Sequence, residues 1–140
     1  MCVSVACEKV AQAVALAKHS ERYADVIEFR LDSLSHPEIE PFVKNCTKPL
    51  LFTNRPAWEG GFFPGPEAAR INLLLQAVQH DCALVDLELK TAPELRGELL
   101  DVLLQHTQTA LIISWHDFTG TPSGAELGEI LQQQIESGAH

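Results

Sequence analysis

The chain has 140 residues, of which 46% are hydrophobic and 21% are charged, a balance typical of one soluble globular domain. Its formal net charge of −9 argues against a nucleic-acid-binding surface, and no basic run contradicts this. No apolar run approaches the ~20 residues that span a bilayer, so we expect no membrane partner.

Short runs rich in β-branched residues alternate with longer stretches of helical period along the chain. The predicted strands are residues 2–6, 25–32, 49–55, 83–90 and 110–118. The predicted helices are residues 8–23, 36–45, 66–80, 92–107 and 124–138. Pro37, Pro66 and Pro93 stand at first-turn positions, and Ser123 is placed to cap the last helix. These βα units predict an α/β fold with a parallel sheet.

Two architectures are compatible with these βα units. By length alone, the chain fits an open flavodoxin-like sheet. A complete (β/α)8 barrel typically needs ~250 residues, so this chain would form only part of one.

The side chains of each predicted strand separate into an apolar and a polar set, because successive residues point to opposite faces. The polar members are Ser4, Glu28, Arg30, Asp32, Thr53, Arg55, Asp86, Glu88, Ser114 and His116. On one strand, a structural ion pair would explain such groups equally well. In a doubly wound sheet, helices cover both faces, so both sets of side chains would be apolar. In a barrel, the inward-facing set includes polar groups that line the mouth at the carboxyl ends of the strands. The alternation outweighs the length argument, and the sequence predicts a partial TIM barrel with five of eight (β/α) units.

The groups at the predicted mouth suit acid–base chemistry on an oxygen-rich small molecule. His116 can take and return a proton near neutrality, although a structural histidine is the alternative. Arg30 and Arg55 can hold carboxylate or hydroxyl oxygens, and Glu28 can accept hydrogen bonds from hydroxyls. Glu59, in the loop after the third strand, could orient His116; an ordinary solvated carboxylate is the alternative.

A metal site is the main competing interpretation of the same mouth. Asp86, Glu88 and His116 could ligate a divalent ion. Arg30 and Arg55 would repel a cation there, so we expect no metal and assign Asp86 and Glu88 to the neutralisation of the arginines.

The glycines of the third loop match no nucleotide-binding motif. The four cysteines show neither metal-ligand nor paired spacing, which indicates reduced thiols in a cytoplasmic protein.

The segments "CVSV", "EFRLD", "TNRPAWEGG", "DLEL" and "SWHDF" resemble, in order and approximate spacing, those of the type I 3-dehydroquinate dehydratases, the Schiff-base dehydroquinases of the shikimate pathway. The resemblance covers the whole chain. It implies a lyase that converts 3-dehydroquinate to 3-dehydroshikimate without a metal or organic cofactor. It also implies that His116 is the general acid/base, with Glu59 as its carboxylate partner and Ser114 in support. The implied substrate-contacting residues are Ser4, Glu28, Phe29, Arg30 and Arg55.

The sequence departs from the family's pattern at its carboxyl end. The family's Schiff-base lysine follows shortly after a segment like "ESGA", and this sequence stops at "ESGAH". We therefore expect a single incomplete (β/α)8-type domain, residues 1–140, that lacks strands six to eight and is inactive alone. Lys90 lies near the carboxyl end of the predicted strand 83–90, at a position whose side chain would point into the barrel. We interpret it as a solvated cation beside Asp86 and Glu88 rather than as a replacement nucleophile.

The predicted fragment would leave its first and fifth strands as open edges, which predicts a homo-oligomer formed through them. Two other functions remain open. One is a catalytically silent ligand-binding or regulatory module. The other is a receiver-like domain with a flavodoxin fold, which carries little weight because the expected acidic and lysine positions read "ACEK", "TNRP" and "SWHD".

Overall fold

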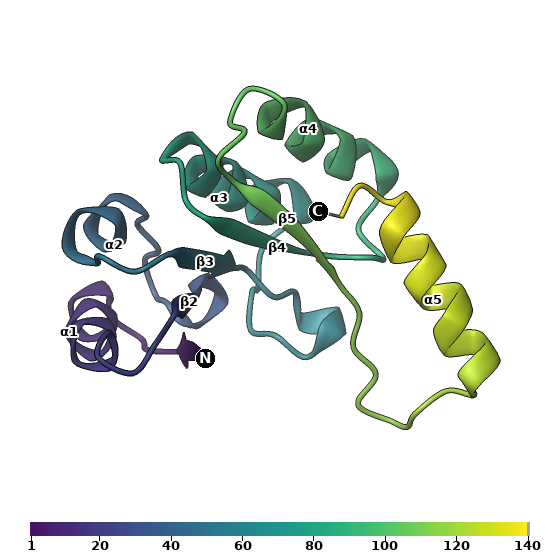
Figure 1. The fold of residues 1–140 in the computed structure, drawn as a ribbon, viewed down its shortest axis with the longest axis horizontal. Coiled ribbons are helices and arrows are strands. Elements are labelled where there is room, and N and C mark those ends of the chain that lie inside the picture. The colour runs from purple at the N-terminus through teal and green to yellow at the C-terminus, as the bar shows by residue number, and fades with distance from the viewer. Residues whose placement is uncertain (140) are drawn as a thin grey trace.

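The computed structural model describes residues 1–139, in which five parallel strands form one sheet in the order β1-β2-β3-β4-β5 (Figure 1). The strands are β1 (Cys2–Val5), β2 (Val26–Arg30), β3 (Leu50–Thr53), β4 (Leu84–Glu88) and β5 (Ala110–Ser114). Each strand pairs with the next one along the chain. A flavodoxin-like sheet would instead reverse its strand order at a switch point. The described sheet is wound in one direction, which confirms the predicted partial barrel and excludes the architecture that length favoured.

The helices form an arc along one face of this sheet (Figure 1). They are α1 (Val10–Ser20), α2 (Glu40–Asn45), α3 (Glu67–Gln79), α4 (Pro93–Leu103) and α5 (Gly124–Glu136). Ser123 caps α5 as predicted, because its hydroxyl accepts the Glu126 N–H while the Glu126 carboxylate accepts the Ser123 N–H. Within residues 1–139, no helix combines the length and apolar composition required to cross a membrane.

Every predicted strand and helix is shorter in the structure than the sequence indicated, and two of them are shortened by identifiable local contacts or turns. The helix expected from residue 36 begins only at Glu40, and Pro37 lies in the connection before it. This connection is held to the first βα loop, where the Ser35 N–H donates to the Glu8 carbonyl at 3.0 Å. The second strand ends at Arg30, because residues 31–33 form a short 3-10 turn, η1 (Leu31–Ser33). Asp32 therefore leaves the strand.

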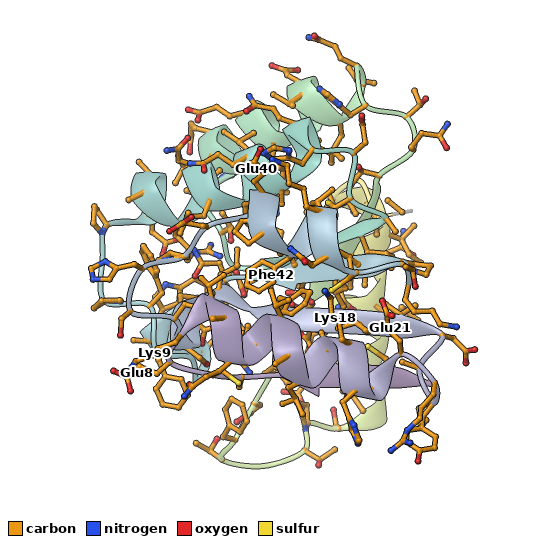
Figure 2. All side chains as sticks on the ribbon, turned by 90° about the vertical axis from the view of Figure 1, so that its left-hand side faces the viewer. Glu8, Lys9, Lys18, Glu21, Glu40 and Phe42 are labelled. Atoms are coloured by element: carbon orange, nitrogen blue, oxygen red, sulfur yellow. The ribbon has the colours of Figure 1, made fainter. Side chains whose placement is uncertain are left out.

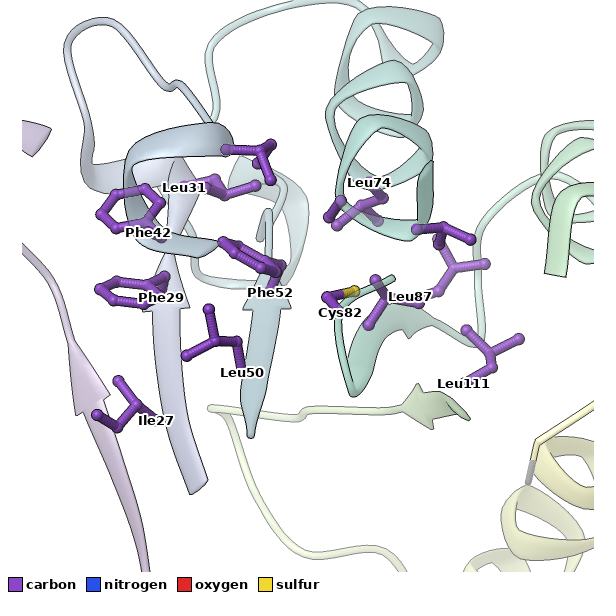
Figure 3. Packing of buried hydrophobic residues seen from close by; sticks show 14 of the residues in the cluster. Ile27, Phe29, Leu31, Phe42, Leu50, Phe52, Leu74, Cys82, Leu87 and Leu111 are labelled. Carbon is purple, nitrogen blue, oxygen red and sulfur yellow. The ribbon is translucent and has the colours of Figure 1, made fainter. Parts of the chain in front are cut away.

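The hydrophobic core lies between the sheet and the helices, and aromatic stacking is prominent in it (Figure 3). The ring of Phe29 on β2 lies 4.0 Å from that of Phe42 on α2 and 5.8 Å from that of Phe52 on β3. Helix α1 contributes the small buried residues Ala13 and Ala17, which allow a close approach to the sheet. The apolar set of each strand thus faces the helices.

The outer ends of α1 and α2 are joined by polar contacts at the surface. The Lys18 ammonium donates to the Asn45 side-chain oxygen at 3.0 Å, and the Glu21 carboxylate accepts the Thr47 N–H at 2.5 Å. Figure 2 shows Lys18 and Glu21 at one end of α1. Charged groups outside and small apolar groups inside fix the orientation of α1.

The face of the sheet opposite the helices has a different character. Toward the amino ends of the strands its side chains are apolar, for example Val26, Leu51 and Ile112, and of these only Leu51 is classed as buried, the other two being partly exposed. Within the described residues, β1 and β5 each pair with a strand on one side only. Toward the carboxyl ends, polar groups replace the apolar ones.

The aromatic stack predicts a large effect of one truncation. Phe42→Ala should lower the free energy of unfolding by about 3–5 kcal/mol, because it removes a fully buried ring that packs against the rings of Phe29 and Phe52. Phe62→Ala is the matched control, since its ring is 70% exposed, and it should change stability by less than about 0.5 kcal/mol. Urea unfolding followed by circular dichroism measures both values. Equal effects of the two substitutions would contradict the described packing.

Candidate active site

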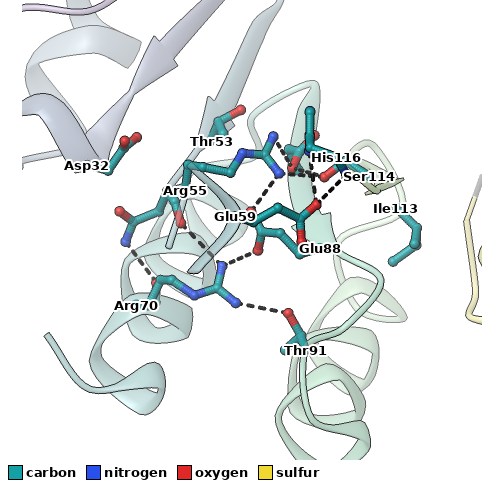
Figure 4. A network of polar contacts seen from close by, with 12 residues as sticks. Asp32, Thr53, Arg55, Glu59, Arg70, Glu88, Thr91, Ile113, Ser114 and His116 are labelled. Carbon is teal, nitrogen blue, oxygen red and sulfur yellow. Dashed lines mark hydrogen bonds and ion pairs between the residues drawn. The ribbon is translucent and has the colours of Figure 1, made fainter. Parts of the chain in front are cut away.

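Polar side chains from neighbouring strands meet at the carboxyl ends of β2 to β5 (Figure 4). Strand register brings them together: Thr53 pairs with Arg30 on one side and with Asp86 on the other. Glu88 pairs with Ser114 on the next strand. Residues directly opposite one another on adjacent strands point to the same face, so the polar set of each strand contributes to one mouth.

The guanidinium of Arg55, just beyond β3, is the centre of this mouth. Its Nη1 donates to Glu88 Oε1 at 2.8 Å and to Ser114 Oγ at 2.7 Å, and its Nη2 lies 3.0 Å from Asp86 Oδ1. Ser114 Oγ in turn donates to Asp86 Oδ1 at 2.7 Å. The planar group is therefore held by residues from two strands. The expectation that Asp86 and Glu88 neutralise an arginine fits Arg55.

Arg30 is neutralised differently from the prediction. Its guanidinium donates two hydrogen bonds to Asp32 in η1, at 2.9 and 2.7 Å, rather than pairing with Asp86 or Glu88. The buried Asp32 carboxylate also accepts the Phe62 N–H at 3.0 Å, which ties the second and third βα loops together. The short turn after β2 brings Asp32 back toward its own strand, which parity alone could not predict.

A second arginine lies beneath the first and was not identified from the sequence. Arg70 on α3 is fully buried, and its Nη1 donates to Glu88 Oε2 at 2.5 Å and to the Asn54 carbonyl at 3.2 Å. Its Nη2 donates to Thr91 Oγ1 at 2.9 Å and to the Glu67 carboxylate, also at 2.9 Å. Glu88 is thus held between two guanidinium groups.

The sequence does contain a signal for Arg70. The buried positions of α3 are residues 70, 71, 74, 77 and 78, so Arg70 occupies the apolar stripe of an amphipathic helix. An arginine at such a position requires a buried acceptor. The acceptor itself, Glu88, lies on another element and could not be assigned from spacing.

Burial changes the proton affinity of the two carboxylates at the mouth. Desolvation raises the pKa of Glu88 to about 7, although the charges of Arg70 and Arg55 oppose this rise. Desolvation also raises the pKa of Asp86, against the opposing effects of Arg55 and the Ser114 hydroxyl. Glu88 therefore changes its charge near neutral pH.

Glu59 and His116 form a pair at the rim of the mouth. Glu59 Oε1 accepts the backbone N–H of His116 at 2.7 Å and lies 3.0 Å from its Nδ1. Glu59 is only 3% exposed, whereas the imidazole side chain is 38% exposed. Because an ionised carboxylate only accepts hydrogen bonds, this contact assigns a proton to Nδ1 and leaves Nε2 available to a partner.

The loop that carries Glu59 depends on two glycines. Gly60 has φ of +76°, and a Cβ there would lie 2.4 Å from a ring carbon of Phe118. A Cβ on Gly61 would lie 2.1 Å from the Arg55 carbonyl oxygen. Only glycine allows the chain to turn this tightly beside β3. Phe118 also lies parallel to the His116 ring, with 6.1 Å between centroids.

The other predicted site residues have varied positions. Glu28 accepts a hydrogen bond from Thr53 Oγ1 at 2.7 Å, and Ser4 is exposed beside Glu28 on the edge strand β1. The Phe29 side chain is not brought to the mouth, because it is buried in the aromatic stack on the helix side.

The predicted inward position of Lys90 is wrong. Strand β4 ends at Glu88, and Lys90 lines a groove with Arg96 and Trp115 instead of the mouth. The parity rule applies only while the chain remains extended.

The competing metal-site interpretation can be compared with the geometry. Asp86 and Glu88 are both engaged by guanidinium groups, whose positive charge disfavours a cation at the same oxygens. Within the described part of the chain, no group of three His, Cys, Asp or Glu side chains is arranged to hold a metal ion.

Comparison with known proteins identifies relatives along the whole chain. The sequence model of the family described as type I 3-dehydroquinase matches residues 1–140. A 3-dehydroquinate dehydratase of Desulfotalea psychrophila is 47% identical over 116 residues, which cover 83% of this chain and 51% of that protein. One from Methanococcus maripaludis is 34% identical over 139 residues, covering 99% of this chain and 63% of that protein. The chain thus spans between about half and two thirds of the length of these curated relatives.

Solved structures give the same result for the fold. A type I 3-dehydroquinate dehydratase from Clostridium difficile, whose structure carries covalently modified comenic acid, superposes with a TM-score of 0.90 at 26% identity. The match covers 99% of this chain and 59% of that one. A 3-dehydroquinate dehydratase from Enterococcus faecalis superposes with a TM-score of 0.86 at 24% identity, which bears on the fold alone.

The raised pKa of Glu88 predicts a specific pH dependence of stability. Between its ordinary value of 4.5 and about 7, the folded state keeps a proton on Glu88 that the unfolded chain has released. The free energy of unfolding should therefore fall as pH rises through this window, by up to about 3 kcal/mol from this group.

Urea unfolding at a series of pH values measures this dependence. The wild-type chain should lose more stability between pH 4.5 and 7 than Glu88→Gln, which cannot titrate. Glu98→Gln, at an exposed position of α4, should keep the wild-type slope. Identical slopes for the wild type and Glu88→Gln would show that Glu88 does not titrate in this range.

Proposed function

Because the chain belongs to the type I 3-dehydroquinase family, we propose that it forms the His116-bearing part of an enzyme that dehydrates 3-dehydroquinate to 3-dehydroshikimate. The observation that best supports this proposal is the Glu59–His116 pair at the rim of the mouth that holds Arg55. A half-exposed imidazole with one nitrogen fixed and the other free is suited to move a proton between two substrate atoms.

In the proposed reaction, His116 Nε2 removes a proton from the carbon next to the substrate carbonyl. The same imidazole then returns a proton to the departing hydroxyl, which leaves as water, so that the enzyme group is restored. Glu59 stabilises the imidazolium that forms between these steps and fixes its orientation. The family resemblance implies that an iminium formed on an enzyme lysine accepts the electrons of the broken C–H bond.

The substrate contacts in this proposal come from the first three strands. Arg55 and Arg30 offer guanidinium groups for the carboxylate and hydroxyl oxygens of 3-dehydroquinate. Ser4 and Glu28 offer a hydroxyl and a carboxylate on the other side of the mouth. Phe29 could take part only through its backbone, because its ring is buried in the core.

The lysine of the proposed mechanism is not among the groups that form the mouth. Of the five lysines of the sequence, Lys90 comes nearest to the carboxyl end of a strand, and it lines the groove outside the mouth. We therefore assign residues 1–140 to an incomplete barrel domain that does not turn over by itself. We assign the Schiff-base lysine to another segment of the whole protein.

The free cysteines suit the reducing cytoplasm, where we place the enzyme.

Borohydride trapping tests the assignment of the lysine. After incubation with 3-dehydroquinate and sodium borohydride, the mass of the chain should be unchanged, since Lys90 does not face the mouth. An adduct located on Lys90 by peptide mass spectrometry would overturn this assignment. Lys90→Met is the matched control for any adduct found.

Binding without turnover tests the proposed mouth itself. In NMR titrations with 3-dehydroquinate, the imidazole signals of His116 should shift saturably. Arg55→Lys should weaken the affinity at least tenfold, because an ammonium cannot donate the two parallel hydrogen bonds of a guanidinium. Lys44→Met, on the far surface of α2, should bind like the wild type. Shifts that are absent would contradict the proposed function, and shifts that Arg55→Lys leaves unaltered would contradict the role of Arg55.

Because β1 and β5 each have one edge without a partner strand in the range 1–139, we propose that the isolated chain associates with itself. Light scattering coupled to size exclusion should give a mass above the 15.4 kDa of one chain. Ile112→Lys, on the open inner face of β5, should shift the population toward the monomer. Leu104→Ser, at an exposed position beyond α4, should not. A wild-type monomer with a sharp unfolding transition would contradict self-association.

A further inference from the structure

A groove lies between α4 and α5, outside the mouth described above. It has a volume of about 720 Å³. Its principal lining residues are Leu89, Lys90, Arg96, Leu100, Trp115 and Ile130. Trp115 follows β5 with the parity of Ile113, which belongs to the core on the helix side. The volume falls within the range of ~300–1,000 Å³ that small-molecule sites usually have.

Two of the residues that line the groove, Lys90 and Arg96, are cations without a carboxylate partner. The chain carries a formal net charge of −9, yet neither Lys90 nor Arg96 forms an ion pair with any residue in the range 1–139. Arg96 Nη1 donates to the Leu89 carbonyl at 3.1 Å, which fixes the guanidinium at the rim and leaves other N–H donors uncommitted. Lys90 is exposed and acts on Asp117 only through its field.

The walls of the groove are apolar and include one aromatic ring. Trp115 offers its indole on the β5 side, Leu100 comes from α4 and Ile130 comes from α5. Glu136 of α5 also lines the groove, and its carboxylate accepts a hydrogen bond from Gln132 at 2.7 Å. The groove therefore combines two cations and one carboxylate with apolar walls.

We propose that this groove binds a small aromatic carboxylate. Its carboxylate would lie between Lys90 and Arg96, where a guanidinium fork and an ammonium match its two oxygens. Its ring would stack on Trp115, with Leu100 and Ile130 on the other walls. Glu136 repels a second negative charge, which favours a monocarboxylate over a dicarboxylate. This assignment does not depend on the proposed dehydratase function.

The groove and the candidate active site lie on opposite sides of the carboxyl ends of β4 and β5. Trp115 stands between Ser114 and His116, and the Leu89 N–H donates to the Ser114 carbonyl at 2.8 Å. A ligand in the groove would therefore contact the outer side of the two strand ends whose inner side carries Glu88 and Ser114.

A titration of the ¹⁵N-labelled chain tests the proposal. Indole-3-acetate is the probe, and the neutral indole-3-ethanol, which has the same ring, is its control. The Trp115 indole N–H signal should shift saturably with indole-3-acetate, with an affinity about tenfold higher than for the alcohol. Trp58→Phe removes the other indole signal and identifies the remaining one.

Variants of the two cations complete the test. Lys90→Met and Arg96→Met combined should weaken binding of indole-3-acetate about tenfold, and Lys44→Met should leave it unchanged. Lys90→Met alone changes only an exposed side chain, so it remains informative if the double variant does not fold, and it should weaken binding at least threefold. Equal affinities for acid and alcohol, an undiminished affinity in Lys90→Met, or no shift at Trp115 would each overturn the proposal.

Discussion

The structure depends on one buried carboxylate shared by two arginines. Glu88 receives Arg55 at one oxygen and Arg70 at the other, and all three side chains are nearly inaccessible to solvent. Charges removed from water in this way are tolerated only when each has a partner, and loss of one partner leaves the others uncompensated. Because Arg55 follows β3, Arg70 lies on α3 and Glu88 ends β4, the network fixes the relative position of three elements. The orientation of Arg55 at the mouth is a consequence of this constraint.

The network also explains why the strands carry charge where a core strand is usually apolar. On the helix side, the aromatic stack of Phe29, Phe42 and Phe52 supplies the hydrophobic stabilisation. The opposite side of the same strands is thereby free to hold polar groups near the carboxyl ends. In a sheet covered by helices on both faces, these groups would have no solvated space to face. Winding in one direction, from β1 to β5, is what makes such a division possible.

The sequence predicted the features that depend on local period and missed those that depend on turns. Strand alternation placed Asp86, Glu88 and Ser114 on one face, because period-two geometry holds within a regular strand. It also gave the right side for Arg55, although this residue lies two positions beyond the end of β3. It failed for Lys90 and Asp32, which lie beyond the strand ends, where the chain leaves the extended conformation. Phe29 was assigned a substrate contact by resemblance, although its parity already placed it among core residues. Arg70 was missed because Glu88, the buried carboxylate that it pairs with, lies on another element, and no local pattern identifies a contact between residues 18 positions apart.

The buried network connects the protonation of Glu88 to the charge of the mouth. With Glu88 ionised, the charge of Arg55 is balanced by two carboxylates, Asp86 and Glu88. When Glu88 binds a proton, as its raised pKa of about 7 allows near neutrality, one of these negative charges is lost and the mouth becomes more attractive to an anion. By reciprocity, an anion bound at Arg55 must raise the proton affinity of Glu88 by the same free energy. Glu88 is therefore not a passive counter-ion: the arginine pair that fixes its position also makes its proton sensitive to any carboxylate that enters.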